Sequence, residues 1–152
     1  LRRSVWLFLN FRILNLKFMS FQLDIVTPEK TIFSDTVDDV YLPGSEGEMG
    51  VLDMHAALVA PLSPGELHYK KDGKIEELAV GEGFVEVSDD KVSVLIDLAI
   101  GEDAIDEAKV EEAMKRAQEA LAGENVDHDE MAALQAAIAK SEAMLKLKRK
   151  RL

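Results

Sequence analysis

Residues 67–80 decide the class of fold, and they read Leu67-His68-Tyr69-Lys70-Lys71-Asp72-Gly73-Lys74-Ile75-Glu76-Glu77-Leu78-Ala79-Val80. Two runs that suit β-strands flank the segment Lys71-Asp72-Gly73-Lys74. Asp-Gly favours the centre of a tight hairpin turn, because both of its residues tolerate positive backbone φ angles. The stretch therefore predicts two antiparallel strands joined by a short turn.

Short apolar runs separated by turn signals extend this pattern to both sides, from Phe21 to Ile100. At its start Phe21, Leu23 and Ile25 alternate with polar residues, which is the period of a half-buried strand. The segment Ser88-Asp89-Asp90-Lys91 predicts a second hairpin. No long helical stretch separates the runs, so a parallel Rossmann-type sheet is not expected. Strands at this spacing predict an antiparallel β-sandwich or barrel.

The period of the apolar residues changes after Gly101. Asp106 suits the N-cap of a first helix, and Gly123 is placed to end it as a left-handed cap. Asp127, with Glu130 three residues later, predicts a capped start for a second helix. The short loop between them predicts an antiparallel helical hairpin. The expected apolar faces are Val110, Ala113, Met114, Ala117 and Leu121 on the first helix, and Met131, Leu134, Ile138 and Leu145 on the second.

The second predicted helix is crowded with alanine, which buries little area per side chain. At roughly 25 cal/mol per Å² of apolar area, such a hairpin gains less than a leucine-rich one. We therefore expect it to be marginal alone and able to change position. The predicted fold class is α+β, with an N-terminal antiparallel β-sandwich over residues 19–101 and a C-terminal helical hairpin over residues 102–152.

Residues 1–18 differ in composition from the rest, with four basic residues, no acidic one and four of the nine aromatic residues. Asn10, Arg12 and Asn15 interrupt the apolar run, and no Ala-x-Ala-like site follows, so a signal peptide is not favoured. The run is also too short and too charged for a transmembrane helix. We interpret residues 1–18 as a leader that results from a misplaced start, with Met19 as the true first residue.

The chain of 152 residues has a formal net charge of −11 and no cysteine. Residues 1–18 hold four of the 18 basic residues and none of the 29 acidic ones, so the remaining residues carry −15. Such an acidic excess repels phosphate backbones and argues against nucleic acid as a partner. The absence of cysteine excludes disulfides, thiolate metal sites and a cysteine nucleophile.

Charge is segregated within the predicted hairpin, which is acid-rich from residue 102 to 130 and basic at its end. Cations suit a helix C-terminus through the helix dipole, which is one explanation of the basic end. Five cations within six residues exceed that need, so we favour an acidic partner surface as their target. These residues are Lys146, Lys148, Arg149, Lys150 and Arg151.

No pattern in the sequence predicts an active site. His55, His68 and His128 lack the spacing of metal ligands, so no metal site is predicted. Neither a Gly-x-Ser-x-Gly elbow nor a Gly-x-x-x-x-Gly-Lys phosphate loop is present. Gly81-Glu82-Gly83 is too short for a dinucleotide motif and suits a tight turn. We predict no catalytic residue, although a small hydrolase built on a carboxylate pair stays open as an alternative.

Residues 44–51, Gly44-Ser45-Glu46-Gly47-Glu48-Met49-Gly50-Val51, combine three glycines with two glutamates. Glycines at this density indicate special backbone angles. We predict a loop between strands. It is either a solvated surface loop or, as we favour, a recognition loop held on a rigid sheet.

This segment, with His55-Ala56 after it, resembles the signature of the F-type ATP synthase epsilon subunit. The family pattern is Gly-Ser-x-Gly-x-Leu/Met-Gly-Ile/Val followed by Pro-Gly-His-Ala-Pro. The resemblance runs from Met19 to Leu152 and leaves residues 1–18 outside. Its other matching segments are Phe21 to Glu29, Phe33-Ser34, Pro64-Gly65 and Gly81 to Val87.

The resemblance implies a non-catalytic rotor subunit that couples proton translocation to ATP synthesis. Its implied partners are the gamma subunit, the membrane rotor ring of c subunits and the alpha/beta catalytic head. By position Glu46, Glu48 and His55 match the loop that faces the ring. The hairpin would lie against the sandwich or extend to restrain ATP hydrolysis, with Lys146 to Arg151 facing an acidic loop of a catalytic subunit. The implied location is peripheral, on the cytoplasmic side of the bacterial inner membrane.

Two departures from the family pattern bear on the site. The Pro-Gly-His-Ala-Pro run is here Asp53-Met54-His55-Ala56-Ala57. Some members bind ATP through Ile/Leu-Asp-x-x-Arg-Ala, where this chain has Asp106 and Lys109-Val110. Lysine lacks the planar fork of arginine, and Arg116 follows one helical repeat later. No cofactor is required, and we expect ATP to be at most a weak regulatory ligand of Asp106, Lys109 and Arg116. The alternative function is a free-standing ATP-sensing β-sandwich module.

Overall fold

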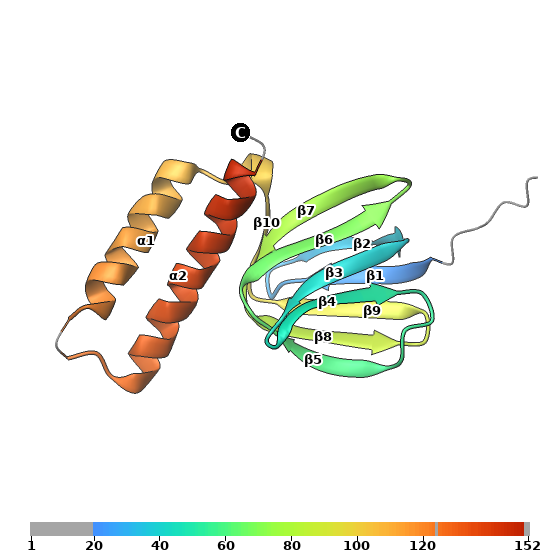
Figure 1. The fold of residues 1–152 in the computed structure, drawn as a ribbon, viewed down its shortest axis with the longest axis horizontal. Coiled ribbons are helices and arrows are strands. Elements are labelled where there is room, and N and C mark those ends of the chain that lie inside the picture. The colour runs from blue at the N-terminus through green and yellow to red at the C-terminus, as the bar shows by residue number, and fades with distance from the viewer. Residues whose placement is uncertain (1–19, 124, 151–152) are drawn as a thin grey trace, which may run out of the picture.

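The computed structural model of the chain describes residues 20–123 and 125–150, so the predicted leader (1–18) and Arg151 lie outside the described part. The described residues form ten strands, a short 3-10 helix and two α-helices (Figure 1). The strands are β1 (Phe21–Val26), β2 (Thr31–Val37), β3 (Asp39–Gly44), β4 (Gly47–Leu52), β5 (Leu58–Leu62), β6 (Gly65–Lys71), β7 (Lys74–Val80), β8 (Gly83–Ser88), β9 (Lys91–Ile96) and β10 (Ala99–Gly101). The helices are η1 (Glu102–Ala104), α1 (Glu107–Leu121) and α2 (His128–Arg149).

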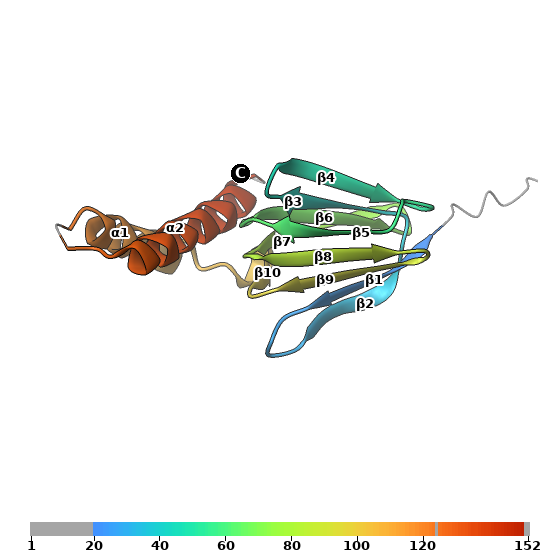
Figure 2. The same cartoon turned by 90° about the horizontal axis from the view of Figure 1, so that it is seen from below.

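The strands follow a bonded path in the order β10-β7-β6-β3-β5-β8-β9-β1-β2, with β4 paired to β3. β3 and β5 meet at the pair Gly44–Leu62, where the path turns into a second layer (Figure 2). Inward-facing side chains of both layers, including Leu23, Leu42 and Val85, form the hydrophobic core. The predicted sandwich followed by a helical hairpin is confirmed. One pairing differs from the antiparallel expectation, because β1 and β9 run parallel.

The hairpin predicted from residues 67–80 is formed by β6 and β7. Asp72 and Gly73 at its turn have φ angles of 52° and 77°. Positive φ at both central positions gives the turn a twist that matches its strands. The second predicted hairpin is formed by β8 and β9 and closes at the pair Ser88–Lys91. Local turn chemistry was thus sufficient to place both hairpins.

Residues 44–51 form a third hairpin, and our prediction of a loop was wrong. β3 and β4 pair along their length, and Ser45-Glu46 is the turn between them. Gly47 has a φ of 128°, whereas Gly50 lies under the Tyr41 ring, where an added Cβ would come within 2.8 Å of a ring carbon. Glycine is a poor strand former, so the composition indicated a loop. Pairing with β3 overrides this preference.

Both predicted helix starts are confirmed. Asp106 accepts a hydrogen bond from the Lys109 backbone N–H at 3.3 Å, and Asp127 accepts one from the Glu130 N–H at 2.8 Å. The prediction for Gly123 was wrong, because its φ lies outside the left-handed region. Its N–H instead donates to a carbonyl three residues back, which tightens the helix end into a 3-10 turn.

α2 lies between α1 and the sandwich, and its C-terminal half contacts β6 and β7 (Figure 1). Burial accordingly increases along the helix, from the exposed Met131 to the buried Leu145 and Leu147. Ala143 and Leu147 of α2 form a second apolar cluster with Ala79 of β7 and with Ile105, which lies in the linker between β10 and α1 (residues 102–106). Of the predicted stripe on α2, Leu145 is buried but lies outside this cluster, so the face of α2 that packs on the sandwich is a different one, formed by Ala143 and Leu147.

Candidate functional site

An apolar row crosses the outer face of the layer formed by β5, β8, β9 and β1. In-register pairs run from Pro61 through Phe84 and Leu95 to Val26. Phe84 and Leu95 are each more than half exposed, and so is Val59, which lies two residues before Pro61 on the same face. We call these five residues the apolar row. Contiguous exposed apolar side chains of this size mark an interaction surface.

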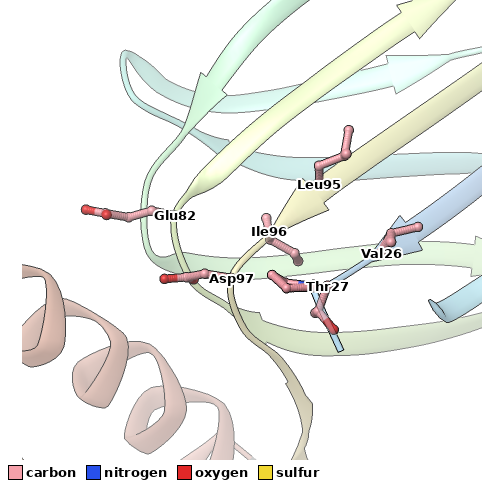
Figure 3. Close-up of a pocket in the computed structure, with 7 residues that line it drawn as sticks. Val26, Thr27, Glu82, Leu95, Ile96 and Asp97 are labelled. Carbon is pink, nitrogen blue, oxygen red and sulfur yellow. The ribbon is translucent and has the colours of Figure 1, made fainter. Parts of the chain in front are cut away.

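A groove of about 330 Å³ adjoins the apolar row at the end nearest the helices (Figure 3). Glu82 and Asp97 point from this groove toward the hairpin. Asp97 forms an ion pair with Lys140 of α2, which ties the hairpin to the sandwich here. The lining residues are Val26, Thr27, Pro28, Glu82, Leu95, Ile96 and Asp97. The surface thus offers apolar contact bordered by carboxylates. We did not predict it from the sequence.

The residues predicted to face a rotor ring lie at opposite ends of β4. Glu46 is in the exposed β3–β4 turn, and Glu48 lies in the first half of β4. Glu48 borders a groove that Lys146 and Lys150 of α2 also line. His55 follows the other end of β4, where its Nδ1 donates to the carbonyl oxygen of the next residue at 2.9 Å. The structure therefore does not bring His55 together with the two glutamates.

Met54, directly before His55, has a left-handed backbone with a φ of 59°. Its side chain is exposed, at 77% of the residue's surface. Met54 stands where the Pro-Gly-His-Ala-Pro run has glycine, so the turn keeps a backbone conformation that suits glycine. A residue with a Cβ strains this conformation.

Two lysines of the basic end face the sandwich. Lys150 Nζ lies 2.7 Å from Glu66 Oε1 and 2.5 Å from Glu77 Oε1, and Lys146 Nζ lies 3.5 Å from Glu66 Oε2. Hydrogen bonds to Glu66 and Glu77 raise the pKa of Lys150 to about 12. Burial raises the pKa of Glu66, but the two lysines outweigh it, so the net shift is downward. Lys150 and Glu66 are therefore charged near neutral pH.

The other cations of the basic end face the hairpin and its linker. Lys148 Nζ donates to the Glu102 carbonyl oxygen at 3.3 Å. Arg149 Nε donates to Glu107 at 2.6 Å, and its other nitrogen pairs with Glu111 of α1. In this conformation the described cations of the predicted partner site thus contact oxygens of their own chain.

The three residues predicted to contact ATP are paired locally on α1. Asp106 and Lys109 form an ion pair at 3.3 Å within the first turn. Arg116 pairs with Glu112 further along the helix. Both pairs are exposed at the surface. The predicted ATP contacts thus form two separate ion pairs.

Within residues 20–123 and 125–150, no group of three or more His, Asp or Glu side chains is placed to hold a metal ion. In the same part of the chain, no helix is both long and apolar enough to cross a membrane. The candidate site is a set of surfaces: the apolar row, the β3–β4 turn and the basic end of α2.

Residues 20–102 match the family described as ATP synthase, Delta/Epsilon chain, beta-sandwich domain. The ATP synthase epsilon chain of Nitratidesulfovibrio vulgaris strain DP4 is 45% identical over 124 residues, which are 80% of this chain and 92% of the relative. The epsilon chain of Ruthia magnifica is 37% identical over 125 residues, or 82% and 90% of the two chains.

Solved structures show a similar fold. A chain of the Euglena gracilis mitochondrial ATP synthase, in a structure of OSCP, F1 and c-ring, aligns with a TM-score of 0.72 and 25% identity, over 83% of this chain and 79% of that one. A chain from the central stalk and c-ring of the Tetrahymena thermophila enzyme aligns with a TM-score of 0.52 at 12% identity, over 86% and 94%, which bears on the fold alone. The chain therefore belongs to the ATP synthase delta/epsilon family, whose epsilon chains are non-catalytic subunits of the synthase complex.

Proposed function

We propose that this chain is a central-stalk rotor subunit of an F-type ATP synthase. It couples proton translocation to ATP synthesis without catalysing either, and its C-terminal hairpin restrains ATP hydrolysis. The apolar row is the observation that carries this proposal, because a subunit that rotates with the central stalk needs a stable interface with it. The proposed partner at that interface is the gamma subunit.

The geometry of the apolar row supports such an interface. Four adjacent strands, about 4.8 Å apart, place Pro61, Phe84, Leu95 and Val26 side by side. Burying one such side chain contributes about 1.5–3 kcal/mol. The carboxylates of Glu82 and Asp97 border the row, so a matching partner surface is apolar at its centre and basic at its rim.

The other proposed contacts follow from the positions of the charged residues. Glu46 and Glu48, at the β3–β4 turn, are proposed to face the rotor ring of c subunits. The basic end of α2 is proposed to face an acidic surface of the alpha/beta head when the hairpin extends. His55 lies at the far end of β4, so its contacts with the ring would be separate from those of the glutamates. Membrane association is then peripheral, through the complex, on the cytoplasmic side of the bacterial inner membrane.

We also propose that ATP binds the hairpin weakly or not at all. Lys109 provides a single ammonium where the motif has the arginine fork, and it is already paired with Asp106. Arg116 would have to leave Glu112 to reach a phosphate. Each exposed pair contributes little, so ATP could displace it but would gain few contacts.

Co-purification with the gamma subunit tests the proposed interface at the apolar row. Phe84→Asp with Leu95→Asp removes two apolar contacts and adds two charges, so binding should fall by at least about 100-fold. Ile75→Asp is the matched control, because Ile75 is also more than half exposed but lies in β7 of the other layer. Both variants should fold, since the residues are exposed. Retention of the gamma subunit by the double variant would contradict the proposal.

A further inference from the structure

Glu66 and Glu77 lie close together on the outer face of β6 and β7. The strands pair so that Glu66 is opposite Ala79 and His68 is opposite Glu77, which places both glutamates on the face that α2 covers. Their side chains are only 14% and 20% exposed. Two partly buried carboxylates on adjacent strands repel one another unless a cation lies between them.

Lys146 and Lys150 supply that cation pair from α2. They are four residues apart, so they lie on one side of the helix, toward the sheet. Lys150 bridges Glu66 and Glu77, and Lys146 adds a second contact to Glu66. The lysines remain partly exposed, so they are reachable from solvent while the glutamates are largely covered.

The remaining cations make different contacts. Lys148 and Arg149 contact the linker carbonyl and the α1 carboxylates. The end of α2 can therefore leave the sandwich without separating from α1. Separation exposes two charged sets at once, the acidic pair on the sheet and the two lysines on the helix.

We propose that Glu66 and Glu77 form an intramolecular binding site on the sandwich, here called the receptor, for Lys146 and Lys150. An acidic partner surface must displace the two glutamates from these lysines before it binds the end of α2. The inference rests on the proposed function, which gives the basic end an acidic target in the catalytic head. It adds that the sandwich and the target compete for the same two lysines. Together with the Asp97–Lys140 ion pair and the apolar contacts of Leu147, the carboxylates of the receptor thus determine how readily the hairpin is released.

A distance measurement on the isolated full-length chain tests the receptor. The sequence has no cysteine, so Ser88→Cys with Gln135→Cys gives a unique pair of exposed label sites on the sandwich and α2. Glu66→Gln with Glu77→Gln should raise the population with a long distance about tenfold at low salt. Added salt should raise it in the wild type as well, because salt screens the ion pairs. Asp89→Asn with Glu142→Gln removes two exposed carboxylates elsewhere and should leave the distances unchanged.

A ten-residue polyglutamate peptide serves as the acidic probe. It should bind the Glu66→Gln/Glu77→Gln variant about tenfold more tightly than the wild type, because it no longer competes with the receptor. Lys146→Gln with Lys150→Gln should weaken that binding. Equal peptide affinities for wild type and variant, or unchanged distances in the variant, would overturn the receptor. Neither measurement involves the assembled synthase, so failure of the rotor proposal would show separately, in the co-purification test.

Discussion

Met54 offers a direct test of the turn beside His55. A residue with a Cβ in the left-handed region costs roughly 1–2 kcal/mol, and Met54 has a φ of 59°. Replacement by glycine removes this strain but increases the entropy of the unfolded chain, which costs about 0.4–1 kcal/mol. The net gain expected from Met54→Gly relative to Met54→Ala is therefore about 0.5–1 kcal/mol. Comparing glycine with alanine cancels the loss of the methionine side chain, which buries little surface because it is 77% exposed.

Urea unfolding of the isolated chain, followed by circular dichroism, measures this difference. The control is Ala132→Gly in the exposed part of α2, where the backbone is helical and glycine should cost about 1 kcal/mol. The two sites should thus respond to glycine with opposite signs. If Met54→Gly is less stable than Met54→Ala, the backbone at this turn is not left-handed and the reasoning is refuted.

Three further predictions concern the hairpin, the sheet and ATP. Deleting residues 123–152 should raise ATP hydrolysis by the assembled synthase while assembly is retained; unchanged hydrolysis would mean that the hairpin does not restrain the enzyme. Hydrogen bonds from Lys91, Gln22 and Ser34 lower the pKa of Asp24 from 3.8 to about 2, so its stabilisation is present above pH 3.8 and is lost as pH falls through 2. Asp24→Asn should therefore be less stable than the wild type at pH 7 and nearly equal to it near pH 2, as thermal unfolding would show. Calorimetry of the full chain should detect no ATP binding at micromolar concentration, and a micromolar Kd would contradict the weak binding that we propose for Lys109.

Elements with local signals were predicted correctly from the sequence. The β6–β7 hairpin follows from Asp72-Gly73, and both helix starts follow from aspartates whose oxygens cap the first turn. Residues 44–51 failed because their strand depends on pairing with β3, which composition does not reveal. Gly123 failed for a related reason, since a helix can also end in a 3-10 turn, which does not require a left-handed glycine.

The apolar row could not be separated from the core by periodicity. In a half-buried strand apolar residues alternate, but Val94-Leu95-Ile96 and Phe84-Val85 are consecutive apolar residues. The extra members, Leu95 and Phe84, are those that point outward. Such a run is compatible with a strand that is buried on both faces. It is equally compatible with a strand whose outer face is a surface for binding a partner. Only the three-dimensional arrangement shows that nothing within the described residues covers Phe84 and Leu95.

The basic end of α2 shows how sequence and structure support different parts of one conclusion. The density of cations indicates an acidic counterpart, but 80 residues separate Lys146 from Glu66, so the sequence gives no reason to pair them. The structure supplies that counterpart inside the chain and divides the cations by helical position, with Lys146 and Lys150 toward the sheet and Arg149 toward α1. An acidic surface elsewhere would recognise the same two lysines through the same chemistry. Internal pairing therefore does not argue against an external partner; it determines the affinity that such a partner must exceed.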